Sequence, residues 1–301
     1  MLHLISGGAG FLGCHLANAL VDDGEEVVLL DDLTNGRVRN LEHSVCSGRA
    51  TFVYAQAPVE VPELDRVIAA GAGRRVSRIY VLASPPHAGA ASAIHEHAAT
   101  LMQLARRHDA RFLFASLHHG NVSADSAPDR YEYTVREAEV LTADAATART
   151  SDARVVRLFD CFGPYMDRQD GRPVPQLIEA LLEHRPLPLG ADGSETFALT
   201  YAADAIEMLR RVMETQTDRF VPVEIGGERE RSVEDIARRL ARIAGVPFSP
   251  AYDRSEQGRP VRRRRAALAR ADALGWNPST ALDDGLRATY RWFARERRAY
   301  A

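Results

Sequence analysis

The chain has 301 residues, of which 46% are hydrophobic and 26% are charged, and its formal net charge at pH 7 is −3. A chain of this length can bury a large core, either as one α/β domain with an appended lobe or as two domains. Its nearly balanced charge gives no general case for a nucleic-acid partner or an anionic membrane. All 38 residues counted as lysine or arginine are arginine, so any mechanism that needs a lysine is excluded.

The cysteines and the apolar runs indicate the compartment. Cys14, Cys46 and Cys161 are dispersed and form no CxxC pair, which predicts a reducing environment and no disulfide framework. No apolar run approaches the roughly 18 residues of a membrane span. No secretory leader is expected, because the first strand-like stretch begins almost at Met1. We therefore expect a cytoplasmic location and no membrane partner.

The first structural unit carries the strongest signal. An apolar strand at 2–6 leads into the sequence GGAGFLG at 7–13, a helix at 12–22 and a second strand at 26–30 that ends at Asp31. Glycines in this place permit a tight turn, close approach of a pyrophosphate and close helix–strand packing. The start of the helix offers N–H groups and a partial positive charge to phosphates. Asp31 can accept hydrogen bonds from a ribose 2′-hydroxyl, which favours NAD over NADP.

The pattern of strands and helices continues along the first half of the chain. Further strand-like runs lie at 51–54, 78–83, 111–115 and 154–158, and helical patterns at 62–71, 92–108 and 131–148. Such alternation predicts a parallel sheet covered by helices on both faces. The expected fold class is therefore α/β, a doubly wound Rossmann sheet with a smaller C-terminal α/β lobe for the substrate.

The second half begins with a region rich in proline and glycine, 165–195, that interrupts this alternation. Helices are expected at 175–182, 203–214, 232–244, 263–274 and 281–297, and a strand at 220–225. Ser232 has the form of a helix N-cap, with the acidic Glu234 and Asp235 in the first turn. We assign residues 1–164 to an NAD-binding domain to which about 196–225 returns, and 165–301 mainly to a substrate-binding lobe.

Several further motifs follow in a fixed order. They are DDLTNGR at 31–37, LASPP at 82–86, RLFDCFGP at 157–164, DGR at 170–172, GADGSET at 190–196, RPVRR at 259–263 and ALGWNP at 273–278. With the glycine turn, they resemble the extended short-chain dehydrogenase/reductases that act on nucleotide sugars. UDP-glucuronate decarboxylases are the most similar, with epimerases and dehydratases nearby. The resemblance implies an NAD cofactor, a UDP- or TDP-linked sugar as substrate, and a homodimer formed through the helices 92–108 and 131–148.

The resemblance also implies roles for the matching positions. Those that would bind the cofactor are Gly7, Gly10, Phe11, Leu12 and Gly13 at the pyrophosphate, Asp31 and Asn35 at the adenosine ribose, and Leu82, Ala83 and Ser84 along its middle. Arg172 and Arg262 would bind the substrate, since a guanidinium makes two parallel bonds to a phosphate. The alternative for 262–265 is a solvated, basic helix start.

The catalytic tyrosine and lysine of the family are only half present. Tyr131 occupies the position of the tyrosine that takes the proton of the sugar C4 hydroxyl, but Val135 replaces the lysine four residues later. Tyrosine titrates near ~10, so action at neutral pH needs a pKa lowered by roughly 2–3 units. Valine offers neither the charge nor a hydrogen bond to the nicotinamide ribose. Tyr133 and Arg136, three positions apart on one helix face, are an alternative pair.

Other family positions differ as well. The family places a Thr-Ser-Glu-like triplet where this chain has Leu117, His118 and His119. Leu117 cannot donate a hydrogen bond, whereas either histidine can act as acid or base near neutrality. Asp160 stands in place of an asparagine, and Phe197 in place of a substrate-contacting arginine. No HExxH or Cys/His spacing predicts a metal site, and we expect none.

Three functions follow from these observations. The first is an NAD-dependent enzyme with a modified mechanism, in which Tyr131 and His118 or His119 act and the cofactor is reduced and re-oxidised in one turnover. The second is a catalytically silent homologue that keeps NAD as a structural element and serves as a partner subunit or ligand-binding module. The third is an RNA-associated or regulatory relative of this fold with the arginines at 262–265 as its patch, which the net charge argues against.

Overall fold

The computed structural model describes most of the chain. The described residues are 1–56, 60–71, 75–82, 93–118, 121–123, 130–169, 171–190, 192–216, 221–253, 261–263 and 266–298. The chain divides into two compact units, each built from several segments. Unit 1 comprises Met1–Leu117, Ala127–Leu158 and Ile206–Glu224, and unit 2 comprises His118–Ser126, Phe159–Ala205 and Ile225–Ala301.

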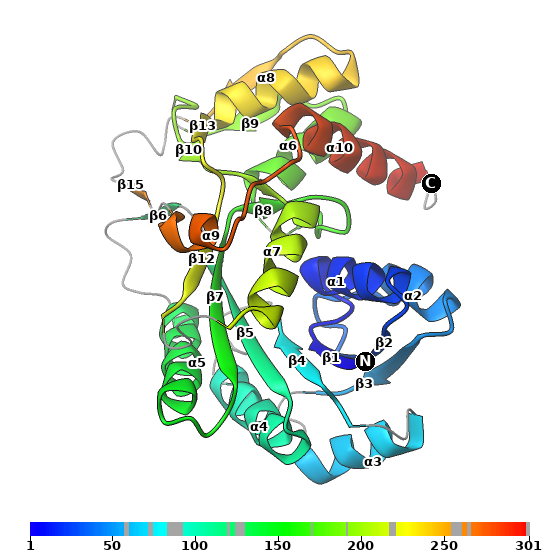
Figure 1. Ribbon diagram of the computed structural model, residues 1–301. Helices are drawn as coiled ribbons and strands as arrows, with labels where there is room; N and C mark the ends of the chain where they lie inside the picture. Colours follow the sequence, from blue (N-terminus) through cyan, green and yellow to red (C-terminus); the bar gives the residue numbers. More distant parts are fainter. Residues whose placement is uncertain are drawn as a thin grey trace. The chain divides into compact units, whose positions relative to one another are not determined.

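The main sheet has seven strands in the order β12-β7-β5-β4-β1-β2-β3 (Figure 1). The strands are β1 (Leu2–Ser6), β2 (Glu26–Asp31), β3 (Ala50–Tyr54), β4 (Arg78–Val81), β5 (Arg111–His118), β7 (Ala153–Phe159) and β12 (Val223–Ile225). β1 pairs in parallel with β2 on one side and with β4 on the other. The strand order therefore reverses between β1 and β4, and ligands of such sheets bind beyond the carboxyl ends of the strands at this switch point. The predicted doubly wound α/β fold is confirmed.

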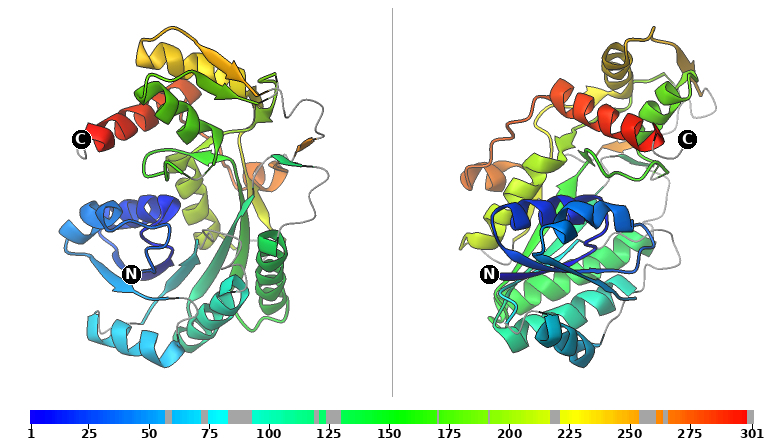
Figure 2. Two further views of the ribbon diagram at one scale, coloured as in Figure 1. Left: turned by 180° about the vertical axis from the view of Figure 1, so that it is seen from behind. Right: turned by 90° about the vertical axis from the view of Figure 1, so that its right-hand side faces the viewer.

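Helices cover both faces of this sheet. α1 (Phe11–Asp22) packs on β1 and β2, and α2 (Glu42–Cys46) follows a short 3-10 turn at Val38–Leu41. On the other face lie α3 (Val61–Gly71), α4 (Ala93–His108) and α5 (Arg130–Thr147), with α4 packed between its two neighbours (Figures 1 and 2). Burial on both faces is the reason that the central strands are almost continuously apolar.

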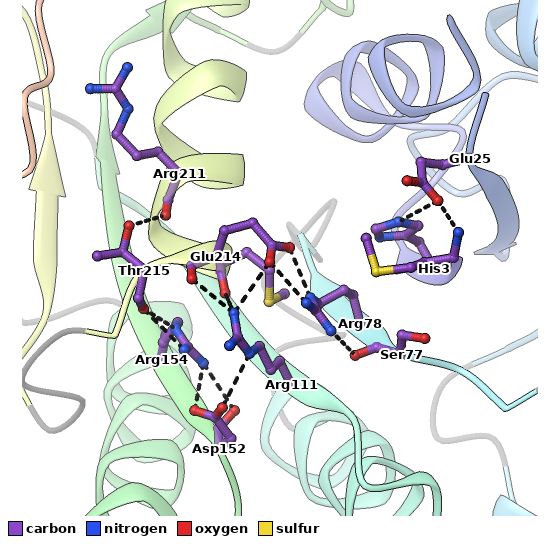
Figure 3. Close-up of polar contacts among 12 residues, drawn as sticks. His3, Glu25, Ser77, Arg78, Arg111, Asp152, Arg154, Arg211, Glu214 and Thr215 are labelled. Atoms are coloured by element: carbon purple, nitrogen blue, oxygen red, sulfur yellow. Dashed lines mark hydrogen bonds and ion pairs between the residues drawn. The ribbon is translucent and has the colours of Figure 1, made fainter. Parts of the chain in front are cut away.

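At the amino-terminal edge of the sheet, arginines on three strands hold the end of a helix (Figure 3). This helix is α7 (Ala202–Glu214), whose segment from residue 206 belongs to unit 1. The fully buried Arg154 donates to the carbonyl of Thr215 at 3.1 Å, Arg111 donates to the Glu214 carbonyl at 2.9 Å, and Arg78 donates twice to the Glu214 carboxylate at 2.9 Å. The last carbonyls of a helix have no partner within it, so these cations satisfy them and oppose the negative end of the helix dipole.

Unit 2 consists of helices and short two-stranded sheets. α6 (Pro173–Leu182), α8 (Val233–Ala244) and α10 (Leu282–Arg298) pack on one another, and α9 (Ala269–Ala273) is shorter. The strand pairs are β8 (Cys161–Phe162) with β11 (Thr200–Tyr201), β9 (Leu187–Leu189) with β14 (Pro250–Tyr252), β10 (Thr196–Phe197) with β13 (Arg231–Ser232), and β6 (Asn121–Ser123) with β15 (Val261–Arg263). The predicted N-cap of α8 is confirmed, since the Ser232 hydroxyl accepts the Asp235 N–H at 3.1 Å.

The prediction of a helix over 263–274 is wrong at its start. Residues 261–263 form β15, which pairs antiparallel with β6, and the helix covers only Ala269–Ala273. Arginine and alanine favour helix by propensity, but propensity is a weak preference that pairing with a distant strand overrides. The alternative of a basic helix start is wrong at Arg262 and Arg263 for the same reason, and 264–265 lie outside the described residues. Within the described ranges, no helix is long and apolar enough to cross a membrane.

Candidate functional site

The glycine turn joins the end of β1 to the start of α1. The N–H groups of Gly7 and Gly8 both donate to the carbonyl of Leu30 on β2, at 2.9 and 3.1 Å. Gly7 has a φ of 79°, in the left-handed region that favours glycine. A Cβ added to Gly13 would lie 1.9 Å from the carbonyl oxygen of Gly7. The turn therefore closes tightly only because these positions have no side chain.

The start of α1 suits an anion. Gly10 is the N-cap residue, so no side-chain oxygen caps the helix, and its first turn contains no acidic residue. Phe11 and Leu12 are the first two residues of the helix. The positive end of the helix dipole is the environment that phosphate groups prefer. The predicted pyrophosphate-binding residues thus lie together in unit 1.

Asp31, at the end of β2, is held against the same turn. Its Oδ2 accepts the N–H of Ala9 at 2.9 Å, and its Oδ1 accepts the N–H of Leu33 at 2.8 Å. Burial raises the pKa of this carboxyl above its ordinary value. Gly36 lies so close that an added Cβ would be 2.5 Å from Asp31 Oδ1. Each carboxylate oxygen keeps a further lone pair, so Asp31 can still accept the hydroxyls of a ribose.

Ser6, at the carboxyl end of β1, and His97, on α4, form a contact beside the end of β4. The sequence analysis selected neither residue. The Leu82 N–H donates to the Ser6 carbonyl at 3.0 Å, which places the predicted cofactor residue Leu82 beside the end of β1. Ser6 Oγ and Nε2 of His97, on α4, are hydrogen-bonded at 2.6 Å, and both side chains are buried. Burial lowers the pKa of His97 to about 4, so the imidazole is neutral at physiological pH.

The lysine position of the family is part of the hydrophobic core. Val135 on α5 is 2% exposed and belongs to the same apolar cluster as Phe112 and Phe114 of β5. Tyr131 lies one turn earlier on α5, and its side chain lies outside the described residues. The alternative tyrosine, Tyr133, is 58% exposed on the helix surface. A buried valine cannot provide the positive charge that lowers the pKa of a tyrosine.

A network of charges around the buried Glu139 lies two turns beyond Tyr131 on the same helix. Glu139 accepts a hydrogen bond from the Ser116 hydroxyl at 2.5 Å. It also accepts hydrogen bonds from Nε of Arg157 at 3.1 Å and from Nη2 at 2.7 Å. The third guanidinium nitrogen of Arg157 donates to Glu224 at 3.2 Å. These bonds join α5 to the ends of β5, β7 and β12, and thus fix the helix that carries Tyr131. An acid on a helix is too common for sequence reasoning to have found it.

Other predicted residues lie in unit 2 or outside the described residues. Arg172 is the N-cap residue of α6, and its Nη1 donates to the Cys161 carbonyl at 2.8 Å. Arg262 is the middle residue of β15, opposite Val122 in the register. His118 ends β5, and only the backbone is described for His118 and Arg262. His119, Ala83 and Ser84 lie outside the described residues.

Two further positions complete the comparison with the family pattern. Asn35 is exposed in the loop after β2, close in sequence to Asp31. Asp160, which replaces an asparagine, has a φ of 43° and is 8% exposed. Asparagine and aspartate both tolerate the left-handed region, so the replacement keeps this backbone conformation. In the part of the chain that the structure describes, no group of three or more His, Cys, Asp or Glu could hold a metal ion.

The doubly wound sheet, the glycine turn and the acid after the second strand define a dinucleotide-binding α/β protein. Residues 3–226 match the NAD dependent epimerase/dehydratase family, and the chain belongs to that family. It is 30% identical over 318 residues to UDP-glucuronic acid decarboxylase 1 of Xenopus tropicalis, covering 97% of this chain and 72% of that protein. It is 28% identical over 315 residues to UDP-glucuronic acid decarboxylase 4 of Arabidopsis thaliana, covering 94% and 66%.

Solved structures show the same fold. UDP-glucose 4-epimerase of Thermotoga maritima, solved with UDP-glucose, matches with a TM-score of 0.83 and 21% identity over 98% of this chain and 99% of that one. The dTDP-glucose 4,6-dehydratase DesIV of Streptomyces venezuelae, solved with NAD and TYD, matches with a TM-score of 0.82 and 24% identity over 100% and 98%. The family resemblance drawn from the sequence motifs is confirmed, and the predicted cofactor, NAD, is that of the family.

Proposed function

We propose that this chain is an NAD-dependent enzyme that decarboxylates or epimerises a nucleotide sugar, with a catalytic centre that lacks the family lysine. The observation that carries the proposal is the Asp31 carboxylate, fixed against the glycine turn by the N–H groups of Ala9 and Leu33. It suits the two ribose hydroxyls of NAD and would repel the 2′-phosphate of NADP. The sugar-nucleotide class is supported by the relatives, which are UDP-glucuronic acid decarboxylases.

The proposal assigns separate binding and catalytic roles to residues of this chain. Gly7, Gly13 and the start of α1 hold the phosphates of the cofactor, and Asp31 holds its adenosine ribose. NAD, when bound, supplies a hydride acceptor for C4 of the sugar. Tyr131 takes the proton of the C4 hydroxyl and returns it. Arg172 and Arg262 are proposed to bind the diphosphate of the substrate, as guanidinium groups do.

The missing lysine determines the pH behaviour of this chemistry. Val135 is buried among apolar side chains, so no charge at that position lowers the pKa of Tyr131. Fewer Tyr131 side chains are then ionised at neutral pH, and we expect turnover to rise with pH toward the ordinary tyrosine pKa of ~10. His118 or His119 serves as the second acid or base.

Assembly and location complete the proposal. A homodimer through α4 and α5 is supported by two apolar side chains, Tyr133 and Val140, that are each 58% exposed on α5. Light scattering of the purified protein tests it. The predicted cytoplasmic location stays a prediction, and the three cysteines Cys14, Cys46 and Cys161 are unpaired thiols, as a reducing compartment requires.

The buried Val135 also favours a second candidate, the catalytically silent homologue that retains NAD. Incubation with UDP-glucuronate, UDP-glucose or UDP-galactose, followed by chromatography and mass spectrometry, separates the two. Release of carbon dioxide, a 4-keto sugar or an epimer, abolished by Tyr131→Phe, supports the enzyme. Tight NAD retention with no product at any pH between about 7 and 10 supports the silent homologue.

A further inference from the structure

The buried pair of Ser6 and His97 lies at the switch point of the sheet. Ser6 is the last residue of β1 and directly precedes Gly7 of the phosphate-binding turn. His97 comes from α4, which follows β4, and β4 is the neighbour of β1 across the reversal of strand order. The imidazole is therefore placed beside the carboxyl ends of β1 and β4, where a bound dinucleotide passes from its pyrophosphate toward its second ribose.

Only one side of this imidazole is satisfied. Nε2 is hydrogen-bonded to Ser6 Oγ at 2.6 Å, whereas Nδ1 is buried with no hydrogen-bond partner among the described residues. When the serine hydroxyl donates to Nε2, the single proton of the neutral ring lies on Nδ1, which becomes a donor. A buried donor without an acceptor is costly, so the arrangement calls for an acceptor oxygen beside Nδ1.

We propose that His97 is a cofactor-binding residue whose Nδ1–H donates to a hydroxyl of the ribose next to the nicotinamide. The inference rests on the proposed NAD cofactor and extends it to a residue that the family resemblance does not include. In the family, the lysine on α5 would make this hydrogen bond, and Val135 at that position cannot. His97 would make it from α4 instead. Because the ring stays neutral at physiological pH, with a pKa lowered to about 4 by burial, His97 supplies the hydrogen bond without the charge.

Two substitutions separate the two sides of the ring. Glutamine places its amide near the position of Nε2, so His97→Gln keeps a partner for Ser6 and removes the Nδ1 donor. Asparagine places its amide near the position of Nδ1, so His97→Asn keeps a donor there and loses the contact with Ser6. His95→Gln, on the same helix with a partly exposed histidine, is the matched control for the substitution itself.

The measurement is the dissociation constant of three ligands by calorimetry: NAD, ADP-ribose, which contains the second ribose, and ADP, which ends at the pyrophosphate. We expect His97→Gln to weaken the binding of NAD and ADP-ribose by about 5- to 10-fold, the effect of one neutral hydrogen bond. The affinity for ADP should stay within about 2-fold of that of the unsubstituted protein. His97→Asn should bind ADP-ribose more tightly than His97→Gln does. Equal weakening of all three ligands, or no weakening of ADP-ribose, overturns the proposal.

Nitrogen-15 NMR of the histidines in the unsubstituted protein gives a second test that does not depend on variant folding. Addition of ADP-ribose should shift the Nδ1 resonance of His97, and addition of ADP should not. If ADP-ribose binds and the Nδ1 resonance of His97 does not shift, the role of His97 is overturned, but the proposed function is not. An unsubstituted chain that binds neither NAD nor ADP-ribose overturns both.

Discussion

Glu139 on α5 and Arg157 on β7 form a two-pronged ion pair, with Nη2 of the guanidinium 2.7 Å from Oε2 and Nε 3.1 Å from both carboxylate oxygens. Glu139 is 5% exposed, and hydrogen bonding to it raises the pKa of Arg157. The same carboxylate accepts the Ser116 hydroxyl at the end of β5. The pair joins α5, which carries Tyr131, to β7, and the Ser116 hydrogen bond joins the same carboxylate to β5.

Glu139→Gln should therefore destabilise the protein. The substitution removes the buried carboxylate that accepts from Arg157 and Ser116, while Arg157 keeps its bond to Glu224 at 3.2 Å. We expect the free energy of unfolding to fall by about 2 kcal/mol. Guanidinium denaturation measures it, with Glu137→Gln on the exposed side of the same helix as the control. A loss below about 0.5 kcal/mol would show that the pair contributes little and that packing alone fixes α5.

Gly36→Ala tests the position of Asp31. The added Cβ would lie 2.5 Å from Asp31 Oδ1 and 2.7 Å from Ala9 Cβ, so the carboxylate must move away from the turn. We expect NAD affinity to fall at least about 10-fold, as the loss of a charge-assisted hydrogen bond implies. Gly48→Ala is the control, because its φ of 72° strains the backbone while an added Cβ there meets nothing within 4 Å. It should lower stability and leave NAD binding unchanged.

Gly285→Ala tests the packing of α10 in unit 2. An added Cβ would lie 2.9 Å from Phe162 Cζ and 2.9 Å from Tyr201 Cδ2, both ring carbons with little room to move. Overpacking costs typically about 1–3 kcal/mol, which exceeds the roughly 1 kcal/mol that alanine gains over glycine in a helix. Thermal unfolding should show a lower midpoint than for the exposed substitution Arg291→Ala. A midpoint equal to or above that of the unsubstituted protein would contradict the contact geometry.

The buried histidine at position 97 makes stability depend on pH. Its pKa falls from 6.5 to about 4 on folding, so between these values the unfolded chain binds the proton and the folded chain does not. Stability is complete above pH 6.5 and is lost as the pH falls through 4, by up to about 3 kcal/mol. The same unfolding measurements between pH 4 and 7.5 should show a shallower decline for His97→Gln. Parallel curves for the two proteins would mean that His97 is accessible to protons in the folded state.

The motifs carried by contiguous residues were predictable in detail. The glycine turn at 7–13, Asp31 after the second strand and the N-cap Ser232 all lie where the sequence placed them. Their structures depend on interactions over a few residues: φ at a glycine, a helix start, or a side chain bonded three positions along. Such short-range constraints leave their signature in the order of residue types.

The network around Glu139 and the pair of Ser6 and His97 were not predictable in this way. Ser6 and His97 are 91 positions apart, and Arg157 and Glu224 are 67 apart. The residues next to one partner in the sequence do not predict the identity of the other partner. The strand at 261–263 was missed for a related reason, because its partner lies at 121–123 and its own arginines favour a helix.

By itself, then, the amino-acid order determined the kind of sheet, the cofactor turn, the family and the absence of a catalytic lysine. The tertiary structure alone decided that Val135 is enclosed by apolar side chains and that the Ala9 N–H holds Asp31. It also decided that the Asp31 carboxylate occupies the space that a side chain at Gly36 would fill, and that His97 is hydrogen-bonded to Ser6. The physical reason is that local geometry follows from adjacent residues. The burial and partners of a charge depend on which distant strands and helices the folded core brings against it.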